Sequence, residues 1–99
     1  MGSHTADVLS ERGHMVTIFD RTPSPWLRKD QEMVVGDILD RDCVKKVVRG
    51  ARFLYHFASI ADIHEAKERP FDTVNINVMG ATTAIQAAVE ENIERFIYA

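Results

Sequence analysis

The stretch GHMVTIFD, residues 13–20, is the part of the sequence that decides the fold. Its glycine stands where a short helix over residues 3–12 would take a left-handed C-terminal cap. The run MVTIF, residues 15–19, is β-branched and aromatic and leads into Asp20, as is typical of a buried strand. We therefore predict a helix, a glycine turn and a strand closed by an acidic residue, in that order.

The same alternation continues along the rest of the chain. The elements expected next are a loop (21–32), a short strand (33–35), a helix that begins at Asp40 or Asp42 and stops at Gly50, a strand (53–57), a loop, a long helix from Pro70 and a strand from Phe96. Strands that alternate with helices indicate right-handed βαβ units and a parallel sheet. A doubly wound domain starts with a strand, and here a helix comes first. The sequence thus predicts an α/β fold whose first, central strand is missing.

The long helix from Pro70 carries two predicted stripes. Its apolar residues step by three and four positions, which is the spacing of one buried stripe. That stripe consists of Phe71, Val74, Val78, Ala81, Ile85 and Ala88. A parallel stripe of small residues, Gly80, Ala84 and Ala87, would let the helix backbone approach its neighbour closely.

Composition argues against several classes of function. The 99 residues carry 12 basic and 15 acidic side chains, a formal charge of −3, and no basic stripe, so we expect no nucleic-acid partner. The longest apolar run, residues 53–61, is too short to cross a bilayer, and no signal peptide is recognised. We therefore expect no membrane partner and a cytoplasmic location. The single Cys43 is interpreted as a small core residue, and no metal-ligand cluster is apparent.

The opening letters MGSH have two interpretations, an expression-tag scar or the end of a glycine-rich turn. Dinucleotide-binding domains place a G-x-G-x-x-G turn before their first helix, and an acidic residue about twenty positions later at the end of the second strand. Gly2 and Asp20 fit that spacing if Gly2 is the last glycine of the turn. The helix after Gly2 would then offer its N-terminal amides to a pyrophosphate. We interpret MGSH as the remainder of such a turn.

Further motifs follow in a specific order: VVGDILD (34–40), LYHFAS (54–59), NINVMGA (75–81) and RFIYA (95–99). With GSHTADVLSERGH (2–14) and IFD (18–20), they give the whole chain a pattern that resembles the extended short-chain dehydrogenase/reductase family. Within it, the pattern is similar to the NAD-dependent nucleotide-sugar epimerases and dehydratases of the UDP-glucose 4-epimerase type. The resemblance implies that residues 1–99 form a partial NAD(P)-binding domain, a Rossmann-type parallel sheet fragment.

The resemblance also implies which residues contact the adenosine half of the cofactor. Asp20 would hold the ribose hydroxyls, and its charge would favour NAD by disfavouring the 2′-phosphate of NADP. Arg21 weakens that preference, since a guanidinium there would accept such a phosphate. Asp37 would take the adenine amino group, with the backbone of Ile38 beside it.

At the other end of the cofactor, Phe57, Ala58 and Ser59 would line the nicotinamide side of the groove. Asn77 would hold the loops at the strand ends in place, or would only satisfy local backbone near a helix start. His56 is expected to be a buried strand residue and not a base. The resemblance places the catalytic Ser or Thr and the Y-x-x-x-K motif outside this chain, so residues 1–99 alone are expected to be inactive.

The complete protein implied by the resemblance oxidises a hydroxyl of a nucleotide sugar by hydride transfer to NAD, and then isomerises, eliminates or reduces the ketone. A homodimer is compatible with it. Ser59 and Ala61 depart from the family pattern, which usually has Gly or Ala and often Lys there. Two alternatives stay open: a non-catalytic dinucleotide sensor or scaffold with the same fold, and a truncated product without function.

Overall fold

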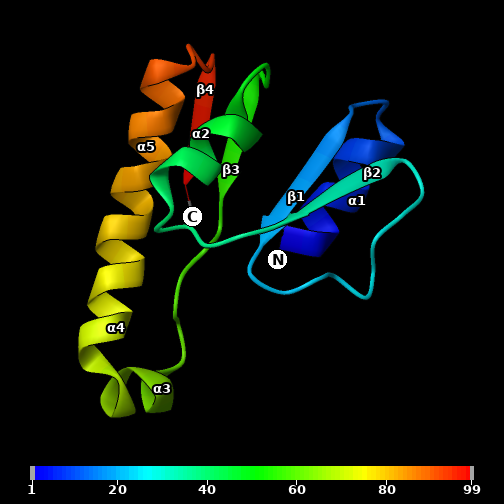
Figure 1. The fold of residues 1–99 in the computed structure, drawn as a ribbon. Helices are drawn as coiled ribbons and strands as arrows, with labels where there is room; N and C mark the ends of the chain where they lie inside the picture. The colour runs from blue at the N-terminus through cyan, green and yellow to red at the C-terminus, as the bar shows by residue number, and fades with distance from the viewer. Residues whose placement is uncertain (1, 99) are drawn as a thin grey trace. The chain divides into compact units, whose positions relative to one another are not determined.

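The computed structural model describes residues 2–98, and the chain divides into two compact units, Met1–Asp37 and Ile38–Ala99 (Figure 1). The first unit contains α1 (Gly2–Glu11), β1 (Val16–Asp20) and β2 (Gln31–Val35). The second contains α2 (Arg41–Val48), β3 (Phe53–His56), α3 (Ile63–Glu68), α4 (Pro70–Val74), the π-helical turn η1 (Asn75–Met79), α5 (Gly80–Glu90) and β4 (Arg95–Tyr98). The predicted order of helices and strands is confirmed, with α3 as an unpredicted addition.

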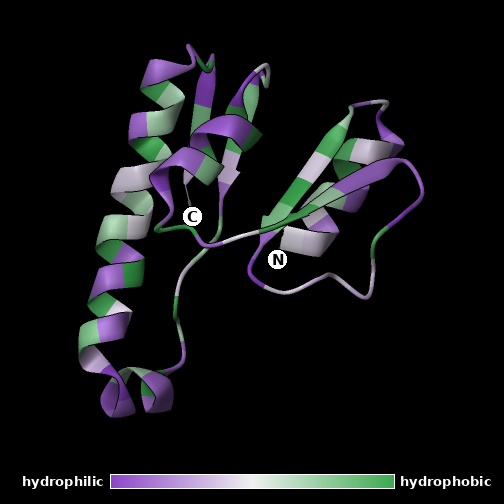
Figure 2. Cartoon of the chain, viewed as in Figure 1, coloured by the Kyte–Doolittle hydropathy of each residue, from purple (hydrophilic) through white to green (hydrophobic). Residues whose placement is uncertain are grey.

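In the first unit, the helix–glycine–strand prediction is confirmed in its order. Gly13 has a φ of +87°, and the next amide, His14 N, donates to Leu9 O at 3.1 Å, which closes α1 as a left-handed cap does. The strand β1, mainly apolar in Figure 2, pairs in parallel with β2 and starts one residue later than predicted. In their register, Val16 pairs with Gln31 and Asp20 pairs with Val35.

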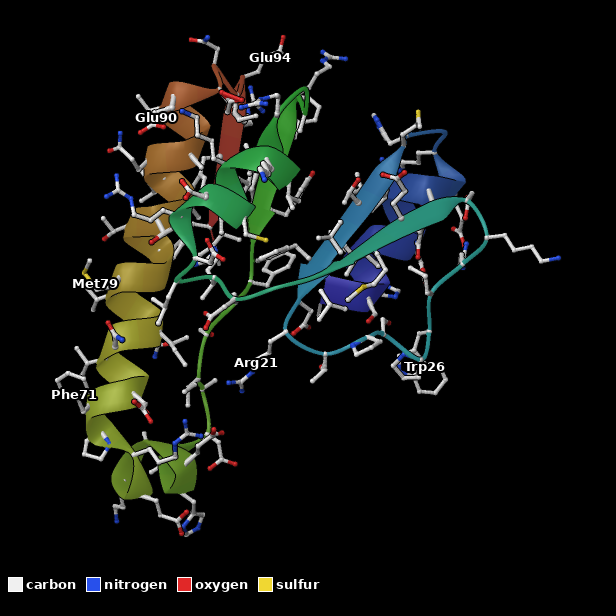
Figure 3. All side chains as sticks on the ribbon, in the orientation of Figure 1. Arg21, Trp26, Phe71, Met79, Glu90 and Glu94 are labelled. Carbon is white, nitrogen blue, oxygen red and sulfur yellow. The ribbon has the colours of Figure 1, made fainter. Side chains whose placement is uncertain are left out.

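The strand β2 starts at Gln31 and not at residue 33 because a polar network fixes its first residue. The buried Gln31 side chain donates to Asp7 Oδ1 at 3.1 Å and to Ser10 Oγ at 3.0 Å, and accepts from Arg28 N at 3.1 Å. Arg28 also pairs with Asp7 and Glu11, and the hydrogen bond to Glu11 raises the pKa of its guanidinium. The loop before β2 is thereby fastened to α1, while Trp26 on that loop stays exposed (Figure 3).

The second unit has its core between α2 and α5. Asp40, and not Asp42, is the N-cap of α2, since its carboxylate accepts from Cys43 N at 3.1 Å. The buried residues of this interface are Val44 and Val48 on α2 and Thr83, Ala84, Ala87 and Ala88 on α5. Three ion pairs join the same region at its surface: Lys45–Glu90, Arg49–Glu91 and Arg52–Glu94.

The strands β3 and β4 form a second two-stranded parallel sheet, in which Phe53 pairs with Arg95 and His56 with Tyr98. The pairs β1–β2 and β3–β4 are those that the order 3-2-1-4-5 places on either side of its first strand. This confirms a Rossmann-type fragment without the central strand. On β3, the side chains of Phe53 and Tyr55 are exposed while Leu54 and His56 point inward, so one face of this strand is covered.

The long helix from Pro70 is interrupted, which its sequence did not predict. Pro70 occupies the first turn of α4, as expected, but residues 75–79 then form a π-helical turn in which Gly80 N donates to Asn75 O. Before it lies the unpredicted helix α3, which Asp62 caps by accepting from His64 N and Glu65 N.

The predicted apolar stripe of this helix is wrong for its four large residues, whereas Ala88 of the same stripe is buried. Phe71, Val74, Val78 and Ile85 are exposed by 81%, 61%, 56% and 47%, and Phe71 and Met79 project outward in Figure 3. The small-residue stripe is the buried one, because helix α2 approaches α5 on that side. The two stripes have the same periodicity, and only the packing of α2 distinguishes them.

His56 is buried on β3, as expected, and its ring stacks on those of Phe96 and Tyr98 with centroids 5.9 and 5.8 Å away. Burial lowers its pKa, because the charged imidazolium loses its hydration. An unfolded chain therefore takes up the proton first, and folding stability is lost as the pH falls from about 6.5 toward the lower folded value. We expect chemical denaturation to show this loss between pH 7 and 5. The His56→Phe variant should lose that dependence, and the exposed-residue control His64→Gln should keep it.

Candidate functional site

The end of β1 carries the first group of predicted cofactor residues. Asp20 is exposed, and its Oδ1 accepts from Arg21 N at 2.7 Å and from Thr22 N at 3.4 Å. The carboxylate thus fixes the turn that follows the strand, as Asp commonly does in turns. This turn needs only Oδ1. The second oxygen of Asp20 is available in that geometry to accept from a ligand hydroxyl.

Asp37 follows directly on Gly36, the residue that joins the end of β2 to the end of β1. Gly36 N donates to Asp20 O at 2.9 Å, one residue beyond the last register pair of the sheet, so the turn after β1 and the segment after β2 lie side by side. Asp37 and Arg21 are both exposed. Gly2, predicted as the last glycine of the phosphate turn, is the exposed first residue of α1.

Ile38 starts the second unit and contacts α5 where that helix begins. A methyl group on the buried Gly80 would lie 3.0 Å from Ile38 Cγ2 and 3.3 Å from Ile38 Cγ1. Such contacts are tighter than ordinary van der Waals packing. The close approach predicted for the small-residue stripe is therefore present at Gly80, and the neighbour is Ile38.

The second group of predicted residues, Phe57, Ala58 and Ser59, forms the segment that directly follows β3. Phe57 is half-buried and stacks at an angle on Tyr55, with centroids 6.2 Å apart, whereas Ala58 and Ser59 are exposed. The segment ends at Ile60, one of the buried apolar residues of the second unit. The exposed Ala58 and Ser59 thus lie between β3 and the buried Ile60.

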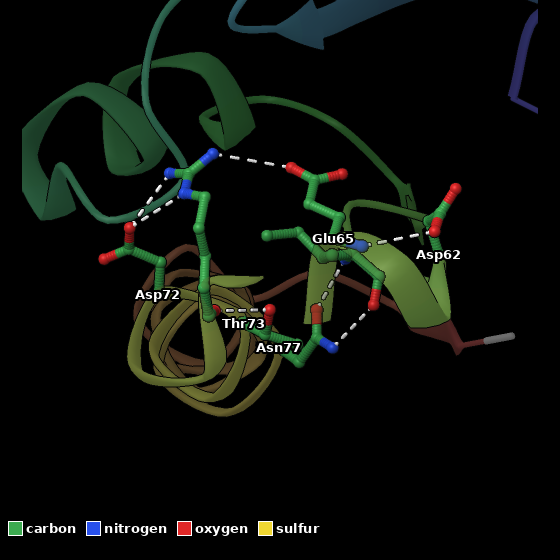
Figure 4. A network of polar contacts seen from close by, with 7 residues as sticks. Asp62, Glu65, Asp72, Thr73 and Asn77 are labelled. Carbon is green, nitrogen blue, oxygen red and sulfur yellow. Dashed lines mark hydrogen bonds and ion pairs between the residues drawn. The ribbon is translucent and has the colours of Figure 1, made fainter. Parts of the chain in front are cut away.

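Asn77 provides that anchor (Figure 4). Its Oδ1 accepts from Ile60 N at 2.7 Å, and its Nδ2 donates to Ile60 O at 2.9 Å. The amide group pairs with the backbone of Ile60 much as a neighbouring strand would. Of the two interpretations offered for Asn77, the loop-holding one agrees with these contacts, because Ile60 lies 17 positions away in the chain.

The π-helical turn brings Asn77 to this position. A π turn holds one residue more than an α turn, so side chains before it are rotated relative to those after it. Asn77 lies in the middle of this turn, three residues before Gly80. One short stretch of helix therefore contacts both Ile38, after β2, and Ile60, after β3.

Ile60 and Asp62 were missed as positioning residues. A signal was present, since Asp62 and Glu65 have the D-x-x-E spacing that often starts a helix.

No group of three or more His, Cys, Asp or Glu side chains suited to a metal ion occurs among the described residues. Within the same residues, none of the helices has the length and apolar character needed to cross a membrane.

The family model described as "NAD dependent epimerase/dehydratase family" matches residues 1–99. The 3-beta-hydroxysteroid dehydrogenase of Mycolicibacterium neoaurum is 33% identical over 106 residues, which cover 99% of this chain and 28% of that protein. The UDP-glucose 4-epimerase of Yersinia enterocolitica is 27% identical over 110 residues, covering 99% of this chain and 33% of the enzyme.

Among solved structures, UDP-glucose 4-epimerase from Brucella ovis in complex with NAD superimposes with a TM-score of 0.89. It is 26% identical, and the match covers 98% of this chain and 31% of that one. The chain thus spans about a third of the length of the relatives it matches.

Proposed function

The chain belongs to the NAD-dependent epimerase/dehydratase family, and from this premise we propose that the residues following β1 and β2 supply the adenosine side of an NAD site. The observation that carries the proposal is the geometry of Asp20. Its Oδ1 accepts from Arg21 N and Thr22 N and so fixes the turn after β1. These two bonds orient the carboxylate without using Oδ2. A carboxylate oriented in this way suits the two ribose hydroxyls of adenosine.

Asp37 and Ile38 complete the adenosine side in this proposal. Asp37 accepts from the adenine amino group, and the backbone of Ile38 lies along the base. Support comes from the hydrogen bond between Gly36 N and Asp20 O, which joins the two strand ends. Gly2 and the following amides of α1 receive the pyrophosphate, since a helix N-terminus favours an anion.

Phe57, Ala58 and Ser59 line the nicotinamide side in the same proposal, and Asn77 holds them by anchoring Ile60. The cofactor supplies the hydride acceptor for a substrate hydroxyl. The residues of this chain bind and orient it. The substrate that we propose for the complete protein is a nucleotide sugar, in line with the two epimerase matches.

A hydroxysteroid is the second candidate substrate, because the relative with 33% identity is a 3-beta-hydroxysteroid dehydrogenase. Product analysis with the complete protein distinguishes the two, since a UDP-sugar epimer and a ketosteroid separate by chromatography. An absence of turnover with either class, together with retained NAD binding, would favour the sensor alternative.

Selectivity for NAD over NADP follows from the charge of Asp20. The 2′-phosphate of NADP would bring a second anion beside this carboxylate, which costs binding free energy. The exposed guanidinium of Arg21 next to it reduces the preference without reversing it. We propose further that the complete protein is cytoplasmic, where Cys43 stays reduced. A homodimer would cover the exposed apolar side chains of α4 and α5.

Substitution of Asp20 tests the adenosine assignment. Asp20→Asn keeps an oxygen that accepts from the turn amides but removes the charge, so NAD affinity should fall about fivefold, the difference between a charged and a neutral hydrogen bond. Asp20→Ala removes both and should weaken NAD binding by about 1.5–3 kcal/mol. NADP affinity should fall less in both variants. Isothermal titration calorimetry measures each, with Asp30→Asn as a control for surface charge. Equal losses for NAD and NADP would contradict the assignment.

A further inference from the structure

Gly80 is an unusual residue for its position. It is the first residue of α5, it is buried, and it lies inside a continuous helical segment that runs from Pro70 to Glu90. Glycine destabilises a helix relative to alanine because it loses more backbone entropy. Its φ of −61° is ordinary for a helix and does not require glycine. The residue must be explained by what it touches.

The contact that explains it is with Ile38. A methyl group at Gly80 would lie 3.0 Å from Cγ2 and 3.3 Å from Cγ1 of that side chain, while Cβ of Ile38 would be 3.8 Å away, an ordinary contact. The helix therefore approaches Ile38 more closely than a side chain at position 80 would allow without a shift. An alanine at position 80 would displace the side chain of Ile38 by a few tenths of an ångström or rotate it.

The backbone that follows Ile38 is fixed by α2. Two residues further on, Asp40 caps α2 through its bond to Cys43 N. Helix α2 is in turn packed on α5 through Val44 and Val48, so both ends of the contact belong to one interface. A displacement of Ile38 would therefore also move the short segment that joins β2 to α2.

We propose that Gly80 is a positioning residue for the adenine end of the NAD site. It fixes Ile38 and, through it, the adjoining Asp37. This inference rests on the proposed function, in which Asp37 and Ile38 contact the adenine. Asn77, three positions earlier, holds Ile60 through two hydrogen bonds. The residues from Asn77 to Gly80 therefore contact both the segment that follows β2 and the segment that follows β3.

The experiment compares NAD with its 6-deamino analogue, nicotinamide hypoxanthine dinucleotide, in which the adenine amino group is replaced by oxygen. Gly80→Ala should weaken NAD binding about fivefold, which corresponds to one misplaced hydrogen bond. Binding of the hypoxanthine analogue should stay within about twofold of the wild-type value, since that hydrogen bond is absent from the start. Thr82→Ala, an exposed position on the same helix, gains helix propensity without facing Ile38 and serves as the matched control.

Rescue by a second substitution separates positioning from a general packing defect. Ile38→Ala removes both atoms that the new methyl group would meet, so the pair Gly80→Ala/Ile38→Ala should recover most of the NAD affinity lost in Ile38→Ala alone. This comparison decides the matter even where Gly80→Ala does not fold. If Gly80→Ala changed NAD affinity neither in the wild-type protein nor in the Ile38→Ala variant, the inference would be overturned.

The outcomes distinguish this inference from the proposed function. NAD binding that responds to Asp20→Asn but not to Gly80→Ala overturns the role of Gly80 alone. Equal weakening of NAD and the hypoxanthine analogue shows a packing effect and also overturns it. A wild-type protein that binds neither dinucleotide overturns the proposed function, and the role of Gly80 with it.

Discussion

Replacing Asn77 by alanine is expected to lower the free energy of unfolding by about 2–5 kcal/mol, because two backbone groups of the buried Ile60 would lose their partners. Leaving a buried donor or acceptor unpaired costs more than the hydrogen bond itself contributes. A chain of this length has a total stability of about 5–15 kcal/mol, so the variant would lie close to the unfolding threshold. Urea denaturation followed by circular dichroism measures the loss.

Asn75→Ala is the matched control, since it removes the same side chain from the same π-helical turn. It should change stability by less than about 0.5 kcal/mol, within the range of ordinary surface substitutions. Asn77→Asp is informative as well, because it keeps an acceptor for Ile60 N and sets an anion against Ile60 O. Similar stability of the Asn77→Ala and Asn75→Ala variants would show that the Ile60 anchor does not stabilise the fold.

The order of elements could be predicted because it depends on local patterns. The β-branched run at residues 15–19, the glycine at 13 and the proline at 70 each act on their own stretch of backbone. Boundaries that depend on distant partners were missed. Strand β2 begins at Gln31 because that side chain bonds to Asp7 and Ser10, more than 20 positions away.

The candidate site was predictable in part for the same reason. The ends of parallel strands meet at one edge, so the link between Asp20 and the segment after β2 follows from the strand order. The π-helical turn has no comparable signal, because an extra residue in a helix is stabilised by tertiary contacts such as those of Asn77. The small-residue stripe predicted that a neighbour approaches Gly80, but not that the neighbour is Ile38.

The choice of buried face on α5 shows most clearly where sequence patterns are insufficient. Two stripes with helical spacing run along this helix, and the larger side chains favoured the wrong one. Hydrophobicity alone cannot rank them, because helix α2 packs closely only against small residues. Ala84 is 1% exposed, whereas its chain neighbour Ile85 is 47% exposed. The same substitution is therefore expected to destabilise the fold strongly at position 84 and only slightly at position 85.

Ala84→Asp is expected to cost about 4 kcal/mol or more, because it places an unpaired carboxylate in the α2–α5 interface. A loss of this size removes most of the stability of a chain at the lower end of the range of about 5–15 kcal/mol, so the urea midpoint should fall steeply. Ile85→Asp introduces the same charge one residue later, in the solvent-exposed stripe, and should cost less than about 1 kcal/mol. Denaturation in dilute solution keeps the comparison to single chains. If Ile85→Asp proved as damaging as Ala84→Asp there, the large apolar stripe would be part of the core, and the packing of α2 on α5 described above would be wrong.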